Sequence, residues 1–202
     1  MRKRSSRGPK PIADFVVPMP KATRDDYAPR PFFYQQTNRS GGLRFVAWTG
    51  DVSQLEGIFV GLLQLLPPVV ELLLKVSNDD DGDDPWERFH GLTRLDRLID
   101  TLRTYRTFVY QDARHQLCVR DPEGRDYIVI DDAGVIYVYS SAAAFRAYLI
   151  EAGLQERQET LITELPHWRQ EPTNRIELLA GFLKALDLTP IEKGGKTGGL
   201  PS

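Results

Sequence analysis

The sequence has a single cysteine, and no run of residues in it assembles a recognisable catalytic, nucleotide-binding or metal-binding motif. Cys118 has no second cysteine to pair with, which excludes an intramolecular disulfide framework and a cysteine-rich zinc site. A chain of 202 residues with 41% apolar residues can bury a sizeable core without such cross-links. These features favour a reducing, intracellular compartment, and we expect a cytoplasmic protein.

Long apolar runs are also missing. The N-terminus is basic, but Asp14 and Pro18 interrupt the short apolar stretch that follows it, which argues against a signal peptide. The longest apolar stretch, 57–70, contains Gln64 and two prolines and is too short and too broken to span a bilayer. We therefore expect neither secretion nor a membrane partner.

The motifs of common enzymes are absent as well. The stretch 194–197 echoes the end of a phosphate-binding loop, but it lacks the upstream glycine spacing, a preceding strand and a following helix. The histidines His90, His115 and His167 show no metal-ligand spacing. Cys118 and His115 are three residues apart, a spacing that in a strand would point them to opposite faces, and Cys118 is interpreted as a small buried hydrophobe. We expect no enzyme activity, no metal and no cofactor.

Charge is nearly balanced overall but uneven along the chain. The formal net charge is −2, which gives no electrostatic footprint for nucleic acid, and no nucleic-acid partner is expected. The first ten residues hold five basic side chains, whereas 79–87 holds six acidic ones and no basic one. Such blocks are usually a solvated tail and a solvated loop; the functional alternative is an electrostatic contact with a partner or between the two blocks.

Residues 78–85, called the acidic loop below, invite comparison with a calcium-binding loop. An EF-hand needs a bidentate glutamate six residues after its glycine. Here Arg88 occupies that position after Gly82, and Glu87 comes one residue too early. The pattern therefore does not predict a metal site.

Composition divides the chain into three parts. Residues 1–11 are predicted to be a disordered basic tail and residues 193–202 a flexible tail, because both have almost no apolar side chains to bury. Residues 12–192 are predicted to form a single α+β domain. Two units, about 30–77 and 105–190, share an order of elements and would be joined by the acidic loop and a helix. That order raises the hypothesis of two pseudo-repeated halves, although recurring α+β order is common without duplication.

The first unit reads as hairpin, helix and strand. Residues 32–37 and 43–48 are predicted strands, with turn residues between them. Asp51 and Gln54 have the spacing of a capping box and open a helix with an apolar stripe from Leu55 to Leu66. Gly57 and Gly61, four apart in this helix, indicate close packing against a strand. Two prolines end the helix, and 69–76 is a mostly buried strand.

The rest of the chain reads as helices around a meander. Its predicted strands are 107–110, 117–120, 127–130 and 135–139, with 159–165 as a further strand. Its predicted helices are 92–104, one capped by Ser140 or Ser141 and ending at Gly153, and one opened by a capping box from Asn174 to Glu177. The fold class is α+β: an antiparallel β-sheet, made of a hairpin and a meander, packed with three to four helices. A doubly wound nucleotide-binding fold is not supported.

Aromatic and acidic residues supply the candidate binding site. The aromatic residues, including Tyr127, Tyr137 and Tyr139, could build a wall at the end of the sheet, although core packing is the commoner role of such side chains. The predicted partner-binding residues combine the tryptophans with acids of the acidic loop: Trp48, Asp80, Asp81, Asp83, Trp86 and Trp168.

The function that these features favour is non-enzymatic. We expect an accessory or regulatory module that binds a protein or peptide, with a basic partner steered by the acidic loop and docked at a sheet edge and its aromatics. One alternative is an immunity-like inhibitor that covers the active site of a basic toxin. Another is an enzyme of unknown class that uses Asp and His residues near the acidic loop, including His167.

Overall fold

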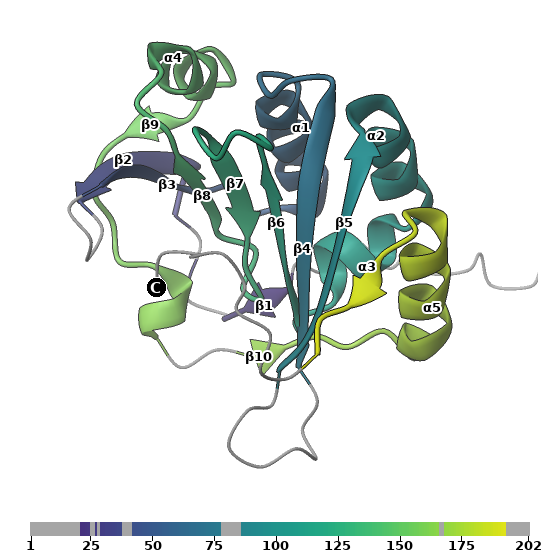
Figure 1. The fold of residues 1–202 in the computed structure, drawn as a ribbon. Coiled ribbons are helices and arrows are strands. Elements are labelled where there is room, and N and C mark those ends of the chain that lie inside the picture. The colour runs from purple at the N-terminus through teal and green to yellow at the C-terminus, as the bar shows by residue number, and fades with distance from the viewer. Residues whose placement is uncertain are drawn as a thin grey trace, which may run out of the picture.

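The protein is built around one nine-stranded sheet, seen face-on in Figure 1. The computed structural model describes residues 21–24, 27, 29–37, 42–77, 86–165 and 168–192. The strand order is β11-β5-β4-β6-β7-β8-β3-β2-β9. Neighbouring strands are antiparallel, except that β2 and β9 run parallel. The α+β class predicted from the sequence is therefore confirmed, with one parallel pair added.

The bounds of the elements are as follows. The strands of the main sheet are β2 (Phe32–Thr37), β3 (Leu43–Trp48), β4 (Val69–Ser77), β5 (Trp86–Arg94), β6 (His115–Arg120), β7 (Tyr127–Ile130), β8 (Ile136–Tyr139), β9 (Gln155–Glu156) and β11 (Thr189–Pro190). A second, two-stranded sheet pairs β1 (Ala22–Thr23) with β10 (Trp168–Arg169). The helices are α1 (Val52–Leu63), α2 (Leu95–Thr104), α3 (Arg106–Gln111), α4 (Ala143–Glu151) and α5 (Arg175–Ala185), with a short 3₁₀ turn, η1 (Ile162–Glu164).

The predicted hairpin is present, and so are three of the four predicted strands of the meander, as β6, β7 and β8. Strands β2 and β3 pair along their whole lengths, from Phe32 opposite Trp48 to Thr37 opposite Leu43. The two meander turns each close on a glycine, Gly124 and Gly134, with φ of +74° and +84°. Each glycine N–H donates to the carbonyl of an aspartate three residues earlier. A residue without a Cβ meets this left-handed requirement without strain.

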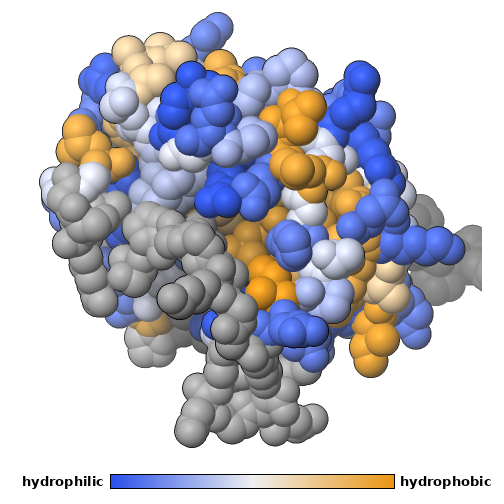
Figure 2. Space-filling view, in the orientation of Figure 1, coloured by the Kyte–Doolittle hydropathy of each residue, from blue (hydrophilic) through white to orange (hydrophobic). Residues whose placement is uncertain are grey.

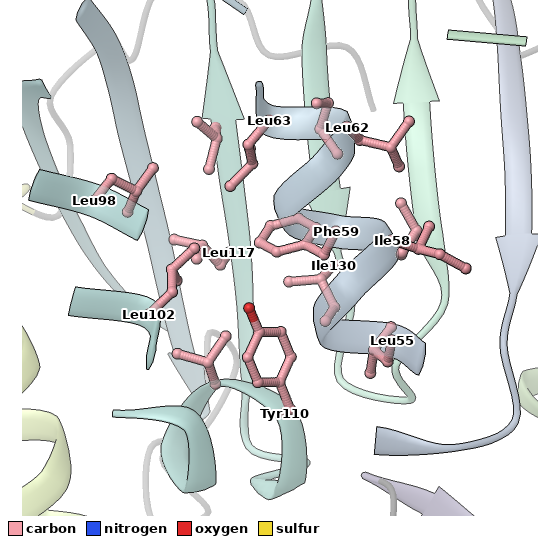
Figure 3. Close-up of a cluster of buried hydrophobic side chains, with 14 of the residues drawn as sticks. Leu55, Ile58, Phe59, Leu62, Leu63, Leu98, Leu102, Tyr110, Leu117 and Ile130 are labelled. Atoms are coloured by element: carbon pink, nitrogen blue, oxygen red, sulfur yellow. The ribbon is translucent and has the colours of Figure 1, made fainter. Parts of the chain in front are cut away.

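Helix α1 forms the centre of the main core, shown in Figure 3. The Asp51 carboxylate accepts a hydrogen bond of 2.8 Å from the Gln54 backbone N–H, so the predicted N-cap is confirmed. The apolar stripe of α1, including Phe59 and Leu62, is buried against sheet residues such as Leu117 and Ile130. Side chains from all five helices of the described part belong to this core or pack against it.

Residues 107–110 were predicted as a strand, and this was wrong. They lie in α3, where Phe108, Val109 and Tyr110 are all buried. The helix follows α2 directly, and the Val109 N–H donates to the Tyr105 carbonyl. A short apolar run fits a buried strand or a buried helix equally well. Here the position of the run in the helical layer determines that it forms a helix. With α3, the described chain has five helices where three to four were expected.

The helix predicted over 92–104 begins later, because its first residues belong to a strand. Strand β5 continues to Arg94, which pairs with Val69 at the far end of β4. The sequence of β5 has no clean apolar alternation, so the strand was not predicted at all. Its nine-residue partner β4, a strongly alternating strand, imposes the conformation through the backbone ladder.

Three smaller predictions also need correction. Residues 159–165 form no strand but an extended segment ending in η1, with Leu161 and Ile162 buried. The helix termini differ too. Neither Asn174 nor Ala142, the N-cap residues of α5 and α4, makes a side-chain capping bond, although the Ser140 hydroxyl accepts from the Ala142 N–H.

The glycine pair of α1 packs against a helix and not against a strand. At Gly61 an added Cβ would lie 1.8 Å from the Tyr148 hydroxyl oxygen of α4, whereas at Gly57 it would meet nothing within 4 Å. The Tyr148 hydroxyl donates to the Gly57 carbonyl at 3.3 Å. Only one of the two glycines is therefore required by close approach.

Parts of the predicted organisation remain predictions. The tails 1–11 and 193–202 lie outside the described residues. Both proposed halves, about 30–77 and 105–190, contribute strands to the same sheet. That arrangement is compatible with one domain and does not test a duplication.

Candidate binding face

The two faces of the sheet differ sharply in burial. Alternate residues of β4, β6 and β7, such as Leu72, Leu117 and Ile128, point to the helices and are completely buried. The residues between them lie on the opposite face of the sheet and, apart from Cys118, are only half-buried. We call this surface the open face; its strand residues are Glu71, Leu73, Lys75, Gln116, Cys118, Arg120, Tyr127, Val129, Tyr137 and Tyr139.

The strand register arranges the open face in three rows. Leu73, Cys118 and Val129 lie side by side on β4, β6 and β7 and form an apolar floor row that ends at Tyr137 on β8. The tyrosine row lies on one side of the floor row, two residues away from it along each strand, and contains Tyr127 and Tyr139. On the other side, the polar row contains Lys75 and Gln116. Figure 2 shows apolar surface in the middle of this face with hydrophilic side chains around it.

The tyrosines and one arginine form a compact cluster. The rings of Tyr127 and Tyr139 are stacked, with centroids 4.1 Å apart and planes inclined by 14°. The Arg44 guanidinium carbon lies 4.9 Å from the centroid of Tyr137 and 5.6 Å from that of Tyr139, within cation–π range. Arg44 also donates to the Tyr139 hydroxyl at 2.8 Å and to the Gln36 side chain. The aromatic wall is therefore held in a fixed arrangement before any partner binds.

A shallow pocket of about 230 Å³ lies over the floor row. The three rows of the open face supply its lining, together with the buried Asp131 at the end of β7. The Asp131 carboxylate accepts from the backbone N–H groups of Ala133 and Val135. Because these hydrogen bonds hold the carboxylate against the backbone, the apolar floor and the tyrosines form the main walls of the pocket.

Two acids at this face are paired with arginines, whereas two of its cations have no paired acid among the described residues. Glu71 accepts from Arg120 at 2.6 Å, and Asp132, which borders the polar row, is 3.0 Å from Arg169. Within the described residues, the Lys75 ammonium group has no hydrogen bond or ion pair, and Arg44 bonds only to neutral groups. Lys75 and Arg44 therefore have no paired carboxylate within the described residues, although the pocket also holds the Asp131 carboxylate.

The predicted site residues are brought together only in part. Trp86 is half-buried and, because it pairs with Ser77, shares the face of Leu73 and Lys75. Trp48 is 4% exposed and packs edge-on against Tyr27 in a separate small core. The backbone of Trp168 lies in β10, in the second sheet. Three acids predicted for the site, Asp80, Asp81 and Asp83, lie outside the described residues.

Sequence reasoning did not identify a buried polar chain at one end of the sheet. Lys21 and His115 are fully buried, and the Lys21 ammonium lies 3.1 Å from His115 Nε2. His115 Nδ1 lies 3.6 Å from an Asp112 carboxylate oxygen, which accepts from Arg175 at 3.1 Å. A lysine that donates to Nε2 requires the neutral imidazole to carry its proton on Nδ1, facing Asp112.

Burial shifts the acid–base properties of this chain. Desolvation and the neighbouring Lys21 charge together lower the pKa of His115 to about 4, against the opposing effect of Asp112. Desolvation likewise lowers the pKa of Lys21 to about 8. It raises the pKa of the nearby Asp131 to about 6, helped by the charge of Asp132. His115 is therefore neutral at pH 7.

The remaining candidates for chemistry are dispersed. His90 is exposed on β5, His115 is enclosed, and His167 lies outside the described residues. Cys118 is 7% exposed, and burial raises the pKa of its thiol to about 12, as expected for a small buried hydrophobe. The described part of the chain holds no group of three or more His, Cys, Asp or Glu side chains placed to hold a metal ion. None of its helices is both long and apolar enough to cross a membrane.

Some of the missed residues had a signal in the sequence. In a strand, alternate residues share a face, so Leu73 and Lys75 on β4 could have been grouped from the sequence. Arg44 and Lys21 had no such signal, because each is defined by its contact with residues about 95 positions away.

Comparison of the chain with protein-family models, with curated proteins and with solved structures finds no match. Its function is therefore inferred from the residues and geometry of the open face.

Proposed function

We propose that this chain is a non-enzymatic, intracellular accessory module that binds a protein or peptide through its open face. The observation that carries the proposal is the contrast between the two faces of one sheet. Five helices cover one face, while the middle of the other presents a tyrosine cluster and an apolar floor to solvent. Tyrosine and arginine beside an apolar centre are the composition typical of binding surfaces.

The neighbouring elements extend this surface. Leu92 on β5 pairs with Glu71 and is 64% exposed on the same side of the sheet. Trp86 lies at the other end of β5, where the acidic loop joins β5 to β4. The acids that follow β4 in the sequence would increase the association rate of a partner that carries basic residues.

Affinity capture from the native host at low salt, with mass spectrometry of the eluate, tests the proposal. Val129→Lys places a charge in the floor row and should abolish stoichiometric capture of the partner. Ile150→Lys is the matched control, because Ile150 is exposed on α4, away from the open face. Circular dichroism melts establish that both variants fold. A partner that both variants retain equally would show that the open face is not the binding site.

A further inference from the structure

We infer that the pocket of the open face recognises an acidic side chain of a partner peptide, together with an apolar or aromatic side chain two residues away. This inference rests on the proposed binding function and names the chemistry of the partner. It starts from the charges of the face, where Glu71 is already paired but the Lys75 ammonium is not. A carboxylate placed beside Lys75 supplies the missing counter-charge.

The size of the pocket favours a side chain over a free metabolite. Its volume of about 230 Å³ is below the roughly 300 Å³ at which sites for small molecules and cofactors usually begin. It lies on the face of the sheet, with a floor of Leu73, Cys118 and Val129. An apolar side chain that projects from an extended backbone would cover this floor and pack against the tyrosines.

The spacing of the rows sets the spacing of the two anchors. The floor row and the polar row are two residues apart along β4, at Leu73 and Lys75. In an extended peptide, side chains two apart lie on the same side and are separated by the same distance. A segment running along β4 would therefore place its apolar side chain on the floor and its acid beside Lys75.

The acidic loop argues against a nucleic acid on this face. Single-stranded nucleic acid also binds aromatic and basic sheet surfaces. Here, however, the five acids of the acidic loop directly precede Trp86 and β5 in the sequence, and they would repel a polyanion. A ligand with a single carboxylate beside Lys75 does not carry that penalty along its whole length.

The test uses the full chain and three capped tripeptides, with amide chemical shifts followed by NMR. Acetyl-Phe-Ser-Glu-amide should shift the resonances of β4, β6 and β7 and should bind about tenfold more tightly than acetyl-Phe-Ser-Gln-amide. Acetyl-Ser-Phe-Glu-amide, in which the anchors are adjacent, should bind about as weakly as the glutamine peptide. Lys75→Met should abolish the preference for glutamate, whereas Lys184→Met, an exposed lysine on α5, should preserve it.

The outcomes separate this inference from the proposed function. Equal binding of the glutamate and glutamine peptides would overturn the acidic-ligand assignment, even if Val129→Lys abolishes capture of the natural partner. Shifts on the open face with a single-stranded oligouridylate but with none of the peptides would overturn it in favour of nucleic acid. Concentration-dependent shifts of the same residues without ligand would overturn it in favour of a second copy of the chain.

Discussion

Tyrosine hydroxyls show how single buried groups affect the stability of this protein. Tyr110 is completely buried, its ring packs edge-on against Phe59, and its hydroxyl has no hydrogen-bond partner among the described residues. Tyr27 is half-buried, and its hydroxyl donates to the Thr160 carbonyl at 2.8 Å. A buried polar group without a partner has lost its bonds to water and gained none in return.

Removing these two hydroxyls should have opposite effects. We expect Tyr110→Phe to raise the free energy of unfolding by about 1 kcal/mol, because it removes an unsatisfied polar atom and keeps the ring. Tyr27→Phe should lower the free energy of unfolding by about 1 kcal/mol, because this substitution removes a hydroxyl that makes a hydrogen bond. Urea denaturation of both variants checks the pair. A destabilised Tyr110→Phe variant would show that this hydroxyl does have a bonding partner.

His115 should make the protein less stable in mild acid. Its pKa is about 4 in the fold, below the ordinary value of 6.5, so the unfolded chain binds its proton more tightly. Stability from this group is therefore fully present above pH 6.5 and is lost as the pH falls toward 4. Asp131, whose pKa is raised to about 6, has the opposite effect between about pH 4 and 6.

A variant isolates the contribution of His115. The difference in stability between the native protein and His115→Gln should shrink by on the order of 2 kcal/mol between pH 7 and pH 4. Denaturation curves collected across this range measure it. His90→Gln is the control, since His90 is exposed, and its curve should run parallel to that of the native protein. A constant difference for His115→Gln would show that this histidine titrates normally in the fold.

Among the secondary-structure elements, the contact between α1 and α4 depends on one glycine. Gly61→Ala would drive a methyl group into the Tyr148 ring and should destabilise the protein by about 1–3 kcal/mol. Gly57→Ala, one turn earlier on the same helix, meets open space and should be neutral or stabilising by up to about 1 kcal/mol. Thermal or urea unfolding of both variants tests the contrast. Equal effects would mean that α4 does not pack on α1 at this point.

The elements differ in how well local sequence defines them. Helix α1 and the strands of the hairpin and meander were predicted, because each has its own apolar period and its own cap or turn residues. Strand β5 and helix α3 were missed. Strand β5 takes its conformation from its hydrogen-bonded pairing with β4. Helix α3 takes its conformation from its place in the helical layer. Local patterns contain neither piece of information.

At the scale of the whole molecule, charge is separated between the acidic loop and the open face. The acidic loop should act on the rate at which a partner arrives, because its acids are concentrated in one short stretch of the sequence between β4 and β5. The contacts of the open face should determine the dissociation rate of the partner. The two contributions therefore differ in their dependence on salt.

Neutralising the acidic loop should slow association with a captured partner without changing dissociation. We expect Asp80→Asn, Asp81→Asn and Asp83→Asn together to lower the association rate severalfold at low salt, with the difference vanishing near 1 M salt. A control with the same change in net charge combines Glu151→Gln, Glu177→Gln and Glu192→Gln, three exposed acids elsewhere. Surface plasmon resonance at several salt concentrations measures both rates. Equal slowing by both triple variants would assign the effect to net charge alone.

The sequence by itself determined the α+β class, the hairpin, the meander, the capped helix α1 and the burial of Cys118. Periodicity, turn residues and caps are local, and they act wherever the chain lies. The binding site predicted from the sequence consisted of three tryptophans and three acids of the acidic loop. These residues stood out because a sequence displays only the type of each residue and its position along the chain.

Only the tertiary structure decided which residues share a surface. Trp48 is enclosed, whereas Tyr127, Tyr139 and Arg44 meet on one face from three strands. Strand order and register are set by contacts between distant segments, so they place Arg44 over tyrosines about 95 residues away and Lys21 against His115. The uncovered face of the sheet follows from where the helices pack, which is a property of the whole fold.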